Sequence, residues 1–362
     1  MNHPVLIIGG GLAGLTAAHL LHQSGHSFAL FEARDRLGGR ILTAEGIDLG
    51  PSWFWPQTQP RLGAFIAGLG LPSFAQHGAG DVIFHRMSRE APQRYQGYPQ
   101  EPQSMRLAGG TGALIAALAG AVPGPCLHLG ARVTALRLHE QGVEATVSGP
   151  EGTTRRVAGA HALLALPPRL LEETVAFSPA LPAATTRLWR DTPTWMAPHA
   201  KFLALYDRPF WRAAGLSGTA QSMAGPMVEI HDATSSSGQA ALFGFLGVPP
   251  AGRAAAGEAA LTAACVQQLA LLFGPEAGAP RATLFKDWAA DPLTATTADQ
   301  IAGGHPAGGT RNWVEGAWAA RLLMAGSETS PVEPGYLAGA VEAAMRAVAE
   351  LQRRAGNAKG DP

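Results

Sequence analysis

The chain has 362 residues, 46% of them apolar, so it is long enough for about two domains with cores of their own. Its 27 basic and 27 acidic side chains balance, which argues against a nucleic-acid partner or an acidic membrane surface. The sequence has no run of about 18 apolar residues, and Cys126 and Cys265 lack metal-ligand spacing. We therefore expect a cytoplasmic protein with no membrane span and no metal site, in which both cysteines are reduced and buried.

The N-terminal residues predict a strand, a glycine turn, a helix and a second strand. Residues 5–8 are continuously apolar, as in a strand buried within a parallel sheet, and a second such strand covers 27–31. Between them, Gly9, Gly11 and Gly14 form a G-x-G-x-x-G turn that opens a helix ending near residue 23. The three glycines permit the tight turn, the approach of a pyrophosphate and close packing of helix and strand. The N–H groups of the first helical turn, including Leu12 and Ala13, then face the phosphates.

Charged residues follow the second strand. Glu32 lies about 20 residues after the turn, where a carboxylate accepts hydrogen bonds from ribose hydroxyls and disfavours NADP. Arg34, Gly39 and Arg40 lie in a second glycine turn, in which a guanidinium can bind phosphate in a bidentate manner. These residues predict a dinucleotide site, but the turn alone does not distinguish FAD from NAD.

The remaining pattern alternates between helices and strands. The fold class is α/β: a Rossmann-like nucleotide-binding domain with a smaller α+β domain inserted in two segments. The nucleotide-binding domain is expected to span 1–71, 107–182 and 289–362, and the inserted domain 72–106 and 183–288. Helices are expected at 60–70, 113–121, 257–273 and 335–351, and strands at 132–138, 142–147, 163–166, 201–206, 227–232, 241–247 and 322–325.

Several blocks, in their order along the chain, resemble the flavin-containing amine oxidases, the superfamily of monoamine and polyamine oxidases. Residues 47–53 resemble the loop that runs past the flavin ring, and 109–112 resemble the family's second glycine turn. Residues 325–329 and 335–340 resemble the C-terminal flavin motif, in which a glutamate supports the ribityl chain. The resemblance implies that the nucleotide-binding domain holds FAD and that the inserted domain binds the substrate. It adds these cofactor-binding residues: Gly50, Pro51, Ser52, Trp53, Val133, Trp288, Gly326, Ser327, Glu328, Gly335, Tyr336 and Leu337.

The catalytic expectation concerns Lys201. In the family, a lysine before a strand that ends in Pro-Phe-Trp holds a water near the flavin N5, and Lys201 matches that position. Its apolar neighbours Phe202 and Leu203 imply an ammonium with a desolvation cost, whose pKa shifts and which handles protons or activates oxygen. The resemblance implies that an amine passes a hydride to flavin N5, that the imine hydrolyses, and that O₂ reoxidises the flavin and yields H₂O₂.

The sequence departs from the family where two aromatic rings form a cage for the amine. Tyr336 matches one ring, Ala295 stands where the second is expected, and Trp53 could compensate. The segment 288–297 has no cysteine, so FAD is expected to be bound non-covalently. In the strand 227–232, alternation puts Glu229 and His231 on one face, and Glu229 falls at a substrate-gating position. We hypothesise that Glu229 contacts a cationic substrate group and that His231 supports it; the alternative is a solvated strand face.

Residues 72–106 are fewer than in the familiar amine oxidases, which implies a reduced lid. The pocket is then more open, accepts a bulky substrate, or is completed by a protein partner or a homodimer. Three other functions remain open: a renalase-like oxidase of dihydronicotinamides, a desaturase or porphyrinogen-type oxidase, and a non-catalytic FAD-binding subunit of a complex. The expected partners are a small amine and O₂.

Overall fold

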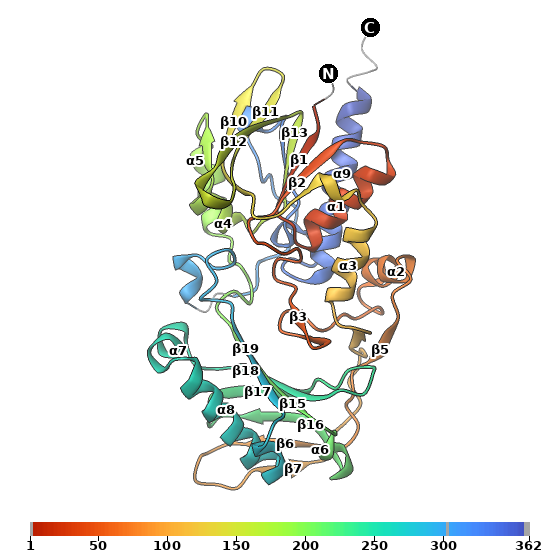
Figure 1. The fold of residues 1–362 in the computed structure, drawn as a ribbon, viewed down its shortest axis with the longest axis vertical. Coiled ribbons are helices and arrows are strands. Elements are labelled where there is room, and N and C mark those ends of the chain that lie inside the picture. The colour runs from red at the N-terminus through yellow and green to blue at the C-terminus, as the bar shows by residue number, and fades with distance from the viewer. Residues whose placement is uncertain (1–2, 302–303, 358–362) are drawn as a thin grey trace. The chain divides into compact units, whose positions relative to one another are not determined.

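The computed structural model describes residues 3–301 and 304–357, which divide into two compact units (Figure 1). Unit 1 is drawn from residues 1–41, 114–195 and 303–362, and unit 2 from 42–113 and 196–302. By packing, residues 42–71, 107–113 and 289–301 belong to unit 2 and 183–195 to unit 1, which differs from the domain bounds expected above. The assignment of the cofactor to one domain and of the substrate to the other remains a prediction.

Unit 1 contains a parallel five-stranded sheet, as the buried apolar runs predict. Val5 pairs with Phe28 and with His161, so the first strand lies inside the sheet. Two helices, α1 (Leu12–Gln23) and α9 (Leu337–Asn357), pack against each other (Figure 1). The strand order is β20 (Leu322–Met324), β13 (His161–Leu164), β1 (Val5–Ile8), β2 (Phe28–Phe31) and β9 (Leu127–His128).

A second sheet of unit 1 has four strands, and large aromatic side chains fill the core beside it. Trp189 and Trp318 are fully buried in that core, together with Leu136 and Val143 from the two central strands. The strand order is β12 (Thr154–Gly159), β11 (Gly142–Ser148), β10 (Arg132–His139) and β14 (Ala176–Ser178). The helical segments are α3 (Gly112–Gly120, mostly in unit 1), α4 (Pro168–Thr174), α5 (Ala183–Arg190), η1 (Gly124–Cys126), η2 (Pro150–Gly152), η5 (Gly316–Trp318) and η6 (Ser327–Thr329).

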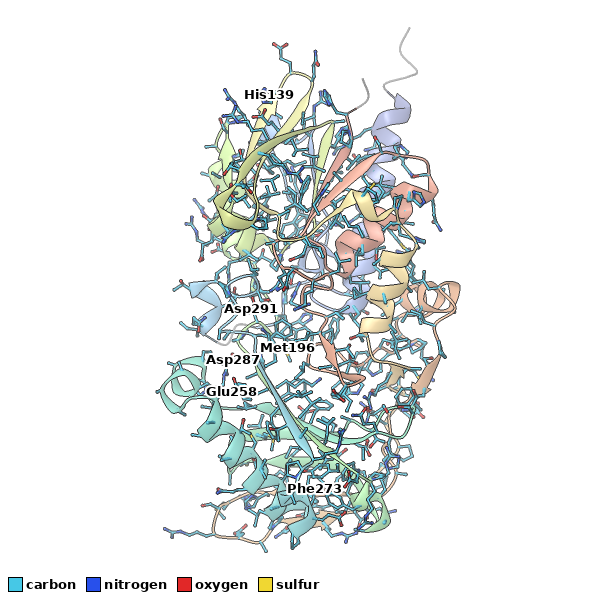
Figure 2. All side chains as sticks on the ribbon, in the orientation of Figure 1. His139, Met196, Glu258, Phe273, Asp287 and Asp291 are labelled. Carbon is cyan, nitrogen blue, oxygen red and sulfur yellow. The ribbon has the colours of Figure 1, made fainter. Side chains whose placement is uncertain are left out.

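Unit 2 contains a mixed seven-stranded sheet, in which β15 (Ala200–Tyr206) and β18 (Ala240–Leu246) are buried on both faces. Helix α8 (Glu258–Phe273), whose two end residues are labelled in Figure 2, packs on one face. Along β15, Phe202 and Ala204 face α8, whereas Leu203 and Leu205 pack with Phe243 on the other face. The strand order is β19 (Ala282–Asp287), β15 (Ala200–Tyr206), β18 (Ala240–Leu246), β17 (Met227–Asp232), β16 (Leu216–Ser222), β6 (Asp81–His85) and β7 (Gln93–Tyr95).

Shorter elements complete unit 2. Strands β3 (Thr43–Ala44) and β4 (Ile47–Asp48) pair, as do β5 (Ser73–Ala75) and β8 (Met105–Leu107). Among the described residues, no single helix is long and apolar enough to cross a membrane. The bent pair of helices α7 (Pro250–Ala256) and α8 meets the requirement of length and composition only when the two are taken together. The remaining helical segments are α2 (Pro60–Gly68), α6 (Phe210–Ala213), α7 (Pro250–Ala256), η3 (Pro275–Gly278) and η4 (Thr297–Gln300).

Two details correct the sequence expectations. Cys126 is only partly buried, whereas Cys265 is fully buried and burial raises the pKa of its thiol to about 12; both are free thiols. The segment 72–106 forms four strands, of which β6 and β7 extend the edge of the seven-stranded sheet. Short polar strands of this kind carry little of the alternation by which strands are recognised.

Candidate active site

The glycine turn between β1 and α1 has the geometry that a bound pyrophosphate needs. Gly9 has φ +107°, and a Cβ on Gly14 would lie 1.9 Å from the Gly9 carbonyl oxygen, so both positions require glycine. A Cβ on Gly11 would meet nothing nearer than 3.7 Å, which leaves space beside the backbone there. No side chain caps the start of α1 at Leu12 and Ala13, so its first N–H groups are available to an anion.

Glu32 is held in place beside this turn. Its side chain accepts hydrogen bonds from the Gly10 N–H (2.8 Å) and the Arg34 N–H (2.8 Å), and the Arg34 guanidinium lies 3.7 Å from it. The carboxylate is 3% exposed, yet these donors leave lone pairs for further hydrogen bonds. This arrangement fits the predicted contact with ribose hydroxyls.

Arg40 and Glu328, 288 positions apart in the sequence, form an ion pair at 2.6 Å. Arg40 also donates to the Ser327 hydroxyl (3.0 Å), and Ser327 donates to Glu328 (3.1 Å). The pair compensates the charge of the buried Glu328 carboxylate. It also joins the turn that contains Gly39 (φ +57°) to the C-terminal flavin motif that begins at residue 325. A Cβ on Gly326 would lie 2.4 Å from the Leu166 carbonyl oxygen, which fixes the backbone of that motif. Val133, one of the cofactor-binding residues that the resemblance implies, is buried on β10.

Tyr336 precedes α9, which begins at Leu337, and has two ring neighbours that the sequence did not indicate. The ring centroid of Trp195 lies 4.7 Å from that of Tyr336, and His305 lies 5.1 Å from it. Gly335 makes this packing possible, because its φ is +83° and a Cβ there would lie 3.3 Å from Trp195. Trp195 and His305 lie in loops, where spacing carries no signal about contacts.

In unit 2, Lys201 is a buried cation held by oxygen atoms. Its Nζ donates to the Gly50 carbonyl oxygen (3.0 Å) and to the Ser52 hydroxyl (2.8 Å), and lies 4.0 Å from the centroid of the Phe243 ring. Only 3% of Lys201 is exposed. Burial lowers the pKa of Lys201 from 10.5 to about 7; Asp48 opposes this shift and Arg106 adds to it.

The segment from Asp48 to Ser52, here the 48–52 loop, is bound through each of its residues. Asp48 accepts from Thr111, Leu49 accepts from the Trp288 indole (3.1 Å), and Pro51 accepts from the Thr111 hydroxyl (3.0 Å). Together with the Lys201 contacts to Gly50 and Ser52, each of the five residues of the loop accepts at least one hydrogen bond. The sequence indicated Lys201, Gly50, Pro51, Ser52 and Trp288, but neither Asp48 nor Thr111 as a functional residue.

Four side chains form one row across the sheet: Glu229 on β17, Phe245 on β18, Lys201 on β15 and Lys286 on β19. Residues paired directly across antiparallel strands point to the same face. We call this surface the Lys201 face. Neighbouring strands lie about 4.8 Å apart, and β18 lies between β17 and β15. The Cα atoms of Glu229 and Lys201 are therefore roughly 10 Å apart.

Glu229 and His231 project together on the Lys201 face, as strand alternation predicts. The His231 Nε2–H donates to Glu229 at 2.6 Å, and this hydrogen bond lowers the pKa of Glu229. His231 contacts the Trp53 ring edge-on, with centroids 4.8 Å apart, while Trp53 donates to Gln76 (2.8 Å). The Glu229 side chain is 47% exposed and the His231 side chain 17%. An accessible carboxylate is thus hydrogen-bonded to a shielded imidazole, which in turn packs against a Trp ring.

The segment after β19 contains the remaining predicted residues. Lys286 pairs with Asp291 at 3.0 Å and lies 4.6 Å from the centroid of the Trp288 ring; Figure 2 labels Asp291. Ala295 is buried in unit 2, whereas Tyr336 belongs to unit 1.

Comparison with known proteins identifies the family. The model of the flavin containing amine oxidoreductases matches residues 90–352, and that of an NAD(P)-binding Rossmann-like domain matches residues 7–69. The chain belongs to the flavin-containing amine oxidoreductase family. It is therefore an FAD-dependent oxidoreductase of a family that oxidises amines.

Relatives and solved structures agree with the family assignment. A Mycobacterium tuberculosis protein that bears the name flavin-containing monoamine oxidase AofH is 26% identical, and the alignment covers 96% of each chain. Human amine oxidase B is 38% identical over 95 residues, 25% of this chain and 18% of that enzyme. Cyclohexylamine oxidase from Brevibacterium oxydans has a TM-score of 0.81 at 21% identity, over 98% of this chain and 100% of that one. Putrescine oxidase bound to putrescine has a TM-score of 0.77 at 20% identity, over 98% and 99%. At these identities, the structures confirm the fold.

The residues of this family member fit FAD. The uncapped start of α1, the space beside Gly11 and the ordered Glu32 carboxylate suit the pyrophosphate and ribose of a dinucleotide. The expected non-covalent binding agrees with the chemistry available, because segment 288–297 has no cysteine and the Cys265 thiol is fully buried.

Proposed function

We propose that this family member oxidises the C–N bond of a small amine and that O₂ is its electron acceptor. Bound FAD would supply the acceptor for a hydride from the amine C–H, and O₂ with a proton would then take up the two electrons and the hydrogen as H₂O₂. Water then hydrolyses the imine to a carbonyl compound and ammonia or a smaller amine. The chain's own residues bind and orient the amine, exclude water and supply positive charge.

The observation that carries the proposal is the buried ammonium of Lys201. Two of its N–H groups have protein acceptors, and within the described residues the third has none, which leaves a donor for a water. A positive charge fixed in a dry environment stabilises the negative charge that develops when O₂ takes up electrons. We therefore assign Lys201 to reoxidation and to proton transfer through that water.

The substrate assignment concerns Glu229, His231 and Trp53. The His231 hydrogen bond favours the anionic form of Glu229, and nearly half of that side chain is accessible. The Glu229 anion attracts an ammonium group by charge, and the Trp53 ring, which packs on the His231 partner of Glu229, can attract it by cation–π interaction. We propose that Glu229 binds a cationic group of the substrate and that Trp53 orients its carbon chain. Tyr336, with Trp195 and His305 around it, is proposed as an aromatic wall in place of the pair of rings that Ala295 cannot complete.

We propose the cofactor contacts that the sequence indicates. Gly9, Gly11, Gly14 and the start of α1 are assigned to the pyrophosphate, and Glu32 to the ribose. The other proposed contacts are Arg34, Gly39, Arg40, Gly50, Pro51, Ser52, Trp53, Val133, Trp288, Gly326, Ser327, Glu328, Gly335, Tyr336 and Leu337.

Anaerobic stopped-flow reduction of the purified FAD-loaded protein tests the proposal. The panel contains primary monoamines, diamines, polyamines, amino acids and dihydronicotinamides, and the oxidised flavin absorbance is followed. Bleaching by amines, followed by one H₂O₂ per flavin after O₂ is admitted, is the expected result. Bleaching by dihydronicotinamides alone would overturn it.

A further inference from the structure

We propose that Asp48 and Thr111 are positioning residues for Lys201: together they fix the 48–52 loop whose oxygens hold the ammonium, and Asp48 supplies negative charge that keeps it cationic. The inference rests on the proposed role of Lys201 in reoxidation. It concerns two side chains that do not touch the Lys201 Nζ themselves.

The loop is anchored at its start by a buried carboxylate. Asp48 is 1% exposed and Thr111 is fully buried. Asp48 Oδ1 accepts from the Thr111 N–H (2.8 Å), from the Thr111 hydroxyl (2.9 Å) and from the Thr43 hydroxyl (2.5 Å). Thr43 also accepts from the Gly112 N–H (2.9 Å), so the contact ties β3 to the start of α3.

The loop is anchored a second time near its end. The Thr111 hydroxyl lies 3.0 Å from the Pro51 carbonyl oxygen as well as 2.9 Å from Asp48. A hydroxyl has one proton, so Thr111 shares it between the two acceptors or alternates between them. Because Gly50 and Ser52 flank Pro51, the same hydroxyl constrains both of the oxygen atoms that hold Lys201.

The charges around Lys201 give Asp48 its second role. Arg106 is the nearby cation, buried and bonded to the carbonyl oxygens of Ala233 and Thr234, and it disfavours the ammonium. Lys286 is paired with Asp291, and Glu229 with His231. Asp48 Oδ2, in contrast, is buried and has no hydrogen-bond partner among the described residues. A carboxylate oxygen without a donor keeps its full charge available to act over distance on Lys201.

Two substitutions separate the roles of charge and anchoring. Asp48→Asn keeps the size of the side chain and the Oδ1 acceptor but removes the charge. Thr111→Val keeps the charge but removes the hydroxyl, and Thr111→Ser restores it. Thr185→Val is the matched control, because Thr185 is equally buried and its hydroxyl has no partner in the described structure.

The composition of the chain makes the protonation of Lys201 directly observable. The sequence has three lysines, at positions 201, 286 and 359. The FAD-loaded protein with ¹³Cε-labelled lysine therefore gives three NMR signals, and Lys201→Met identifies the one to follow through a pH titration. In parallel, the flavin is reduced photochemically without substrate, and its reoxidation by O₂ is measured across pH.

We expect Asp48→Asn to lower the pKa of Lys201 by about one unit and to shift the pH dependence of reoxidation by the same amount. We expect Thr111→Val to slow reoxidation roughly fivefold, and Thr111→Ser and Thr185→Val to stay within about twofold of the wild type. An unshifted Lys201 titration in Asp48→Asn, with normal reoxidation in Thr111→Val, would overturn the inference. If Lys201→Met reoxidises normally, the proposed role of Lys201 fails, and the Lys201 titration in Asp48→Asn still tests the positioning of the ammonium.

Discussion

At the scale of single residues, Lys201 is unusual because a buried ammonium normally has a carboxylate partner. In the described part of the chain, Lys201 forms no ion pair; a carbonyl oxygen, a hydroxyl and the Phe243 ring take its place. Neutral dipoles compensate less of the lost hydration than a carboxylate would, and the pKa falls to about 7. The residue therefore changes charge near neutral pH.

Lys201→Met should slow reoxidation by O₂ at least roughly tenfold and remove its pH dependence. In the wild type, the rate should fall as pH rises through about 7, because the cationic form provides the stabilising charge. Stopped-flow reoxidation of the photoreduced protein measures both effects. An unchanged pH profile in the variant would contradict the assignment.

The same substitution should stabilise the protein. The folded-state pKa of Lys201 is about 7, against 10.5 for an ordinary lysine, so between these values the unfolded chain binds more protons. This lysine therefore lowers stability at neutral pH, and its contribution improves as pH rises from about 7 toward 10.5. Thermal unfolding should give a higher Tm for Lys201→Met at pH 7 and a smaller difference at pH 9. Equal Tm values at both pH values would argue against a buried cation.

Glu229→Gln should weaken binding of a cationic substrate, with a KM about fivefold higher and little change in Lys201-dependent reoxidation. The effect is modest because the side chain is half exposed, and water screens exposed pairs. Steady-state kinetics on the best amine found measure it. Glu258→Gln, at the exposed start of α8, is the matched control. A fall in kcat at unchanged KM would instead place Glu229 in the chemistry.

At the scale of elements, the turn from β1 to α1 depends on close backbone contact. Gly14→Ala would place a methyl group 1.9 Å from the Gly9 carbonyl oxygen and should destabilise the fold by about 2 kcal/mol while lowering FAD occupancy. Gly120→Ala lies in helix α3 with nothing within 4 Å and should be neutral or mildly stabilising. The flavin-to-protein absorbance ratio and the urea unfolding midpoint report the two effects. Full FAD occupancy in Gly14→Ala would contradict the proposed tight turn.

Alternating and continuous runs of apolar residues in the sequence predicted the strands and the helix that carry the candidate site residues. They gave β1, β2, β15, β17 and α1 to within a few residues, and with them the common face of Glu229 and His231. They missed α7, whose Pro-rich start and Gly257 (φ +79°) interrupt helical spacing, and began the next helix at Gly257, one residue before α8. Asp48 and Thr111 lie 63 positions apart, and no local pattern reports which polar side chains become buried together.

At the scale of the whole molecule, we expect FAD to connect the glycine turn, the Arg40–Glu328 pair and the C-terminal motif, which all belong to unit 1. We expect all of the flavin to leave with the supernatant when the protein is denatured and precipitated, because no thioether can form in segment 288–297. Excess FAD should raise the Tm of the native protein, since a ligand that binds the folded state alone stabilises it. Flavin fluorescence of the supernatant and pellet measures the first effect. Flavin retained in the pellet would require a covalent link elsewhere.

Lys201 and Glu229, two members of the row across the seven-stranded sheet, differ in how firmly the backbone holds them. Strand β15 pairs on both sides in continuous register and is buried on both faces, so a slip of one residue would bury Lys201 against α8. Strand β17, which carries Glu229, shifts register between Met227 and Glu229, and that side chain is half exposed. Substitutions at position 229 should therefore disturb the fold little, whereas position 201 accepts only side chains that fit a buried site, such as methionine. An architecture of this kind can acquire new substrates by mutation on β17, while the reaction with O₂ that we propose for Lys201, two strands away, is inherited unaltered.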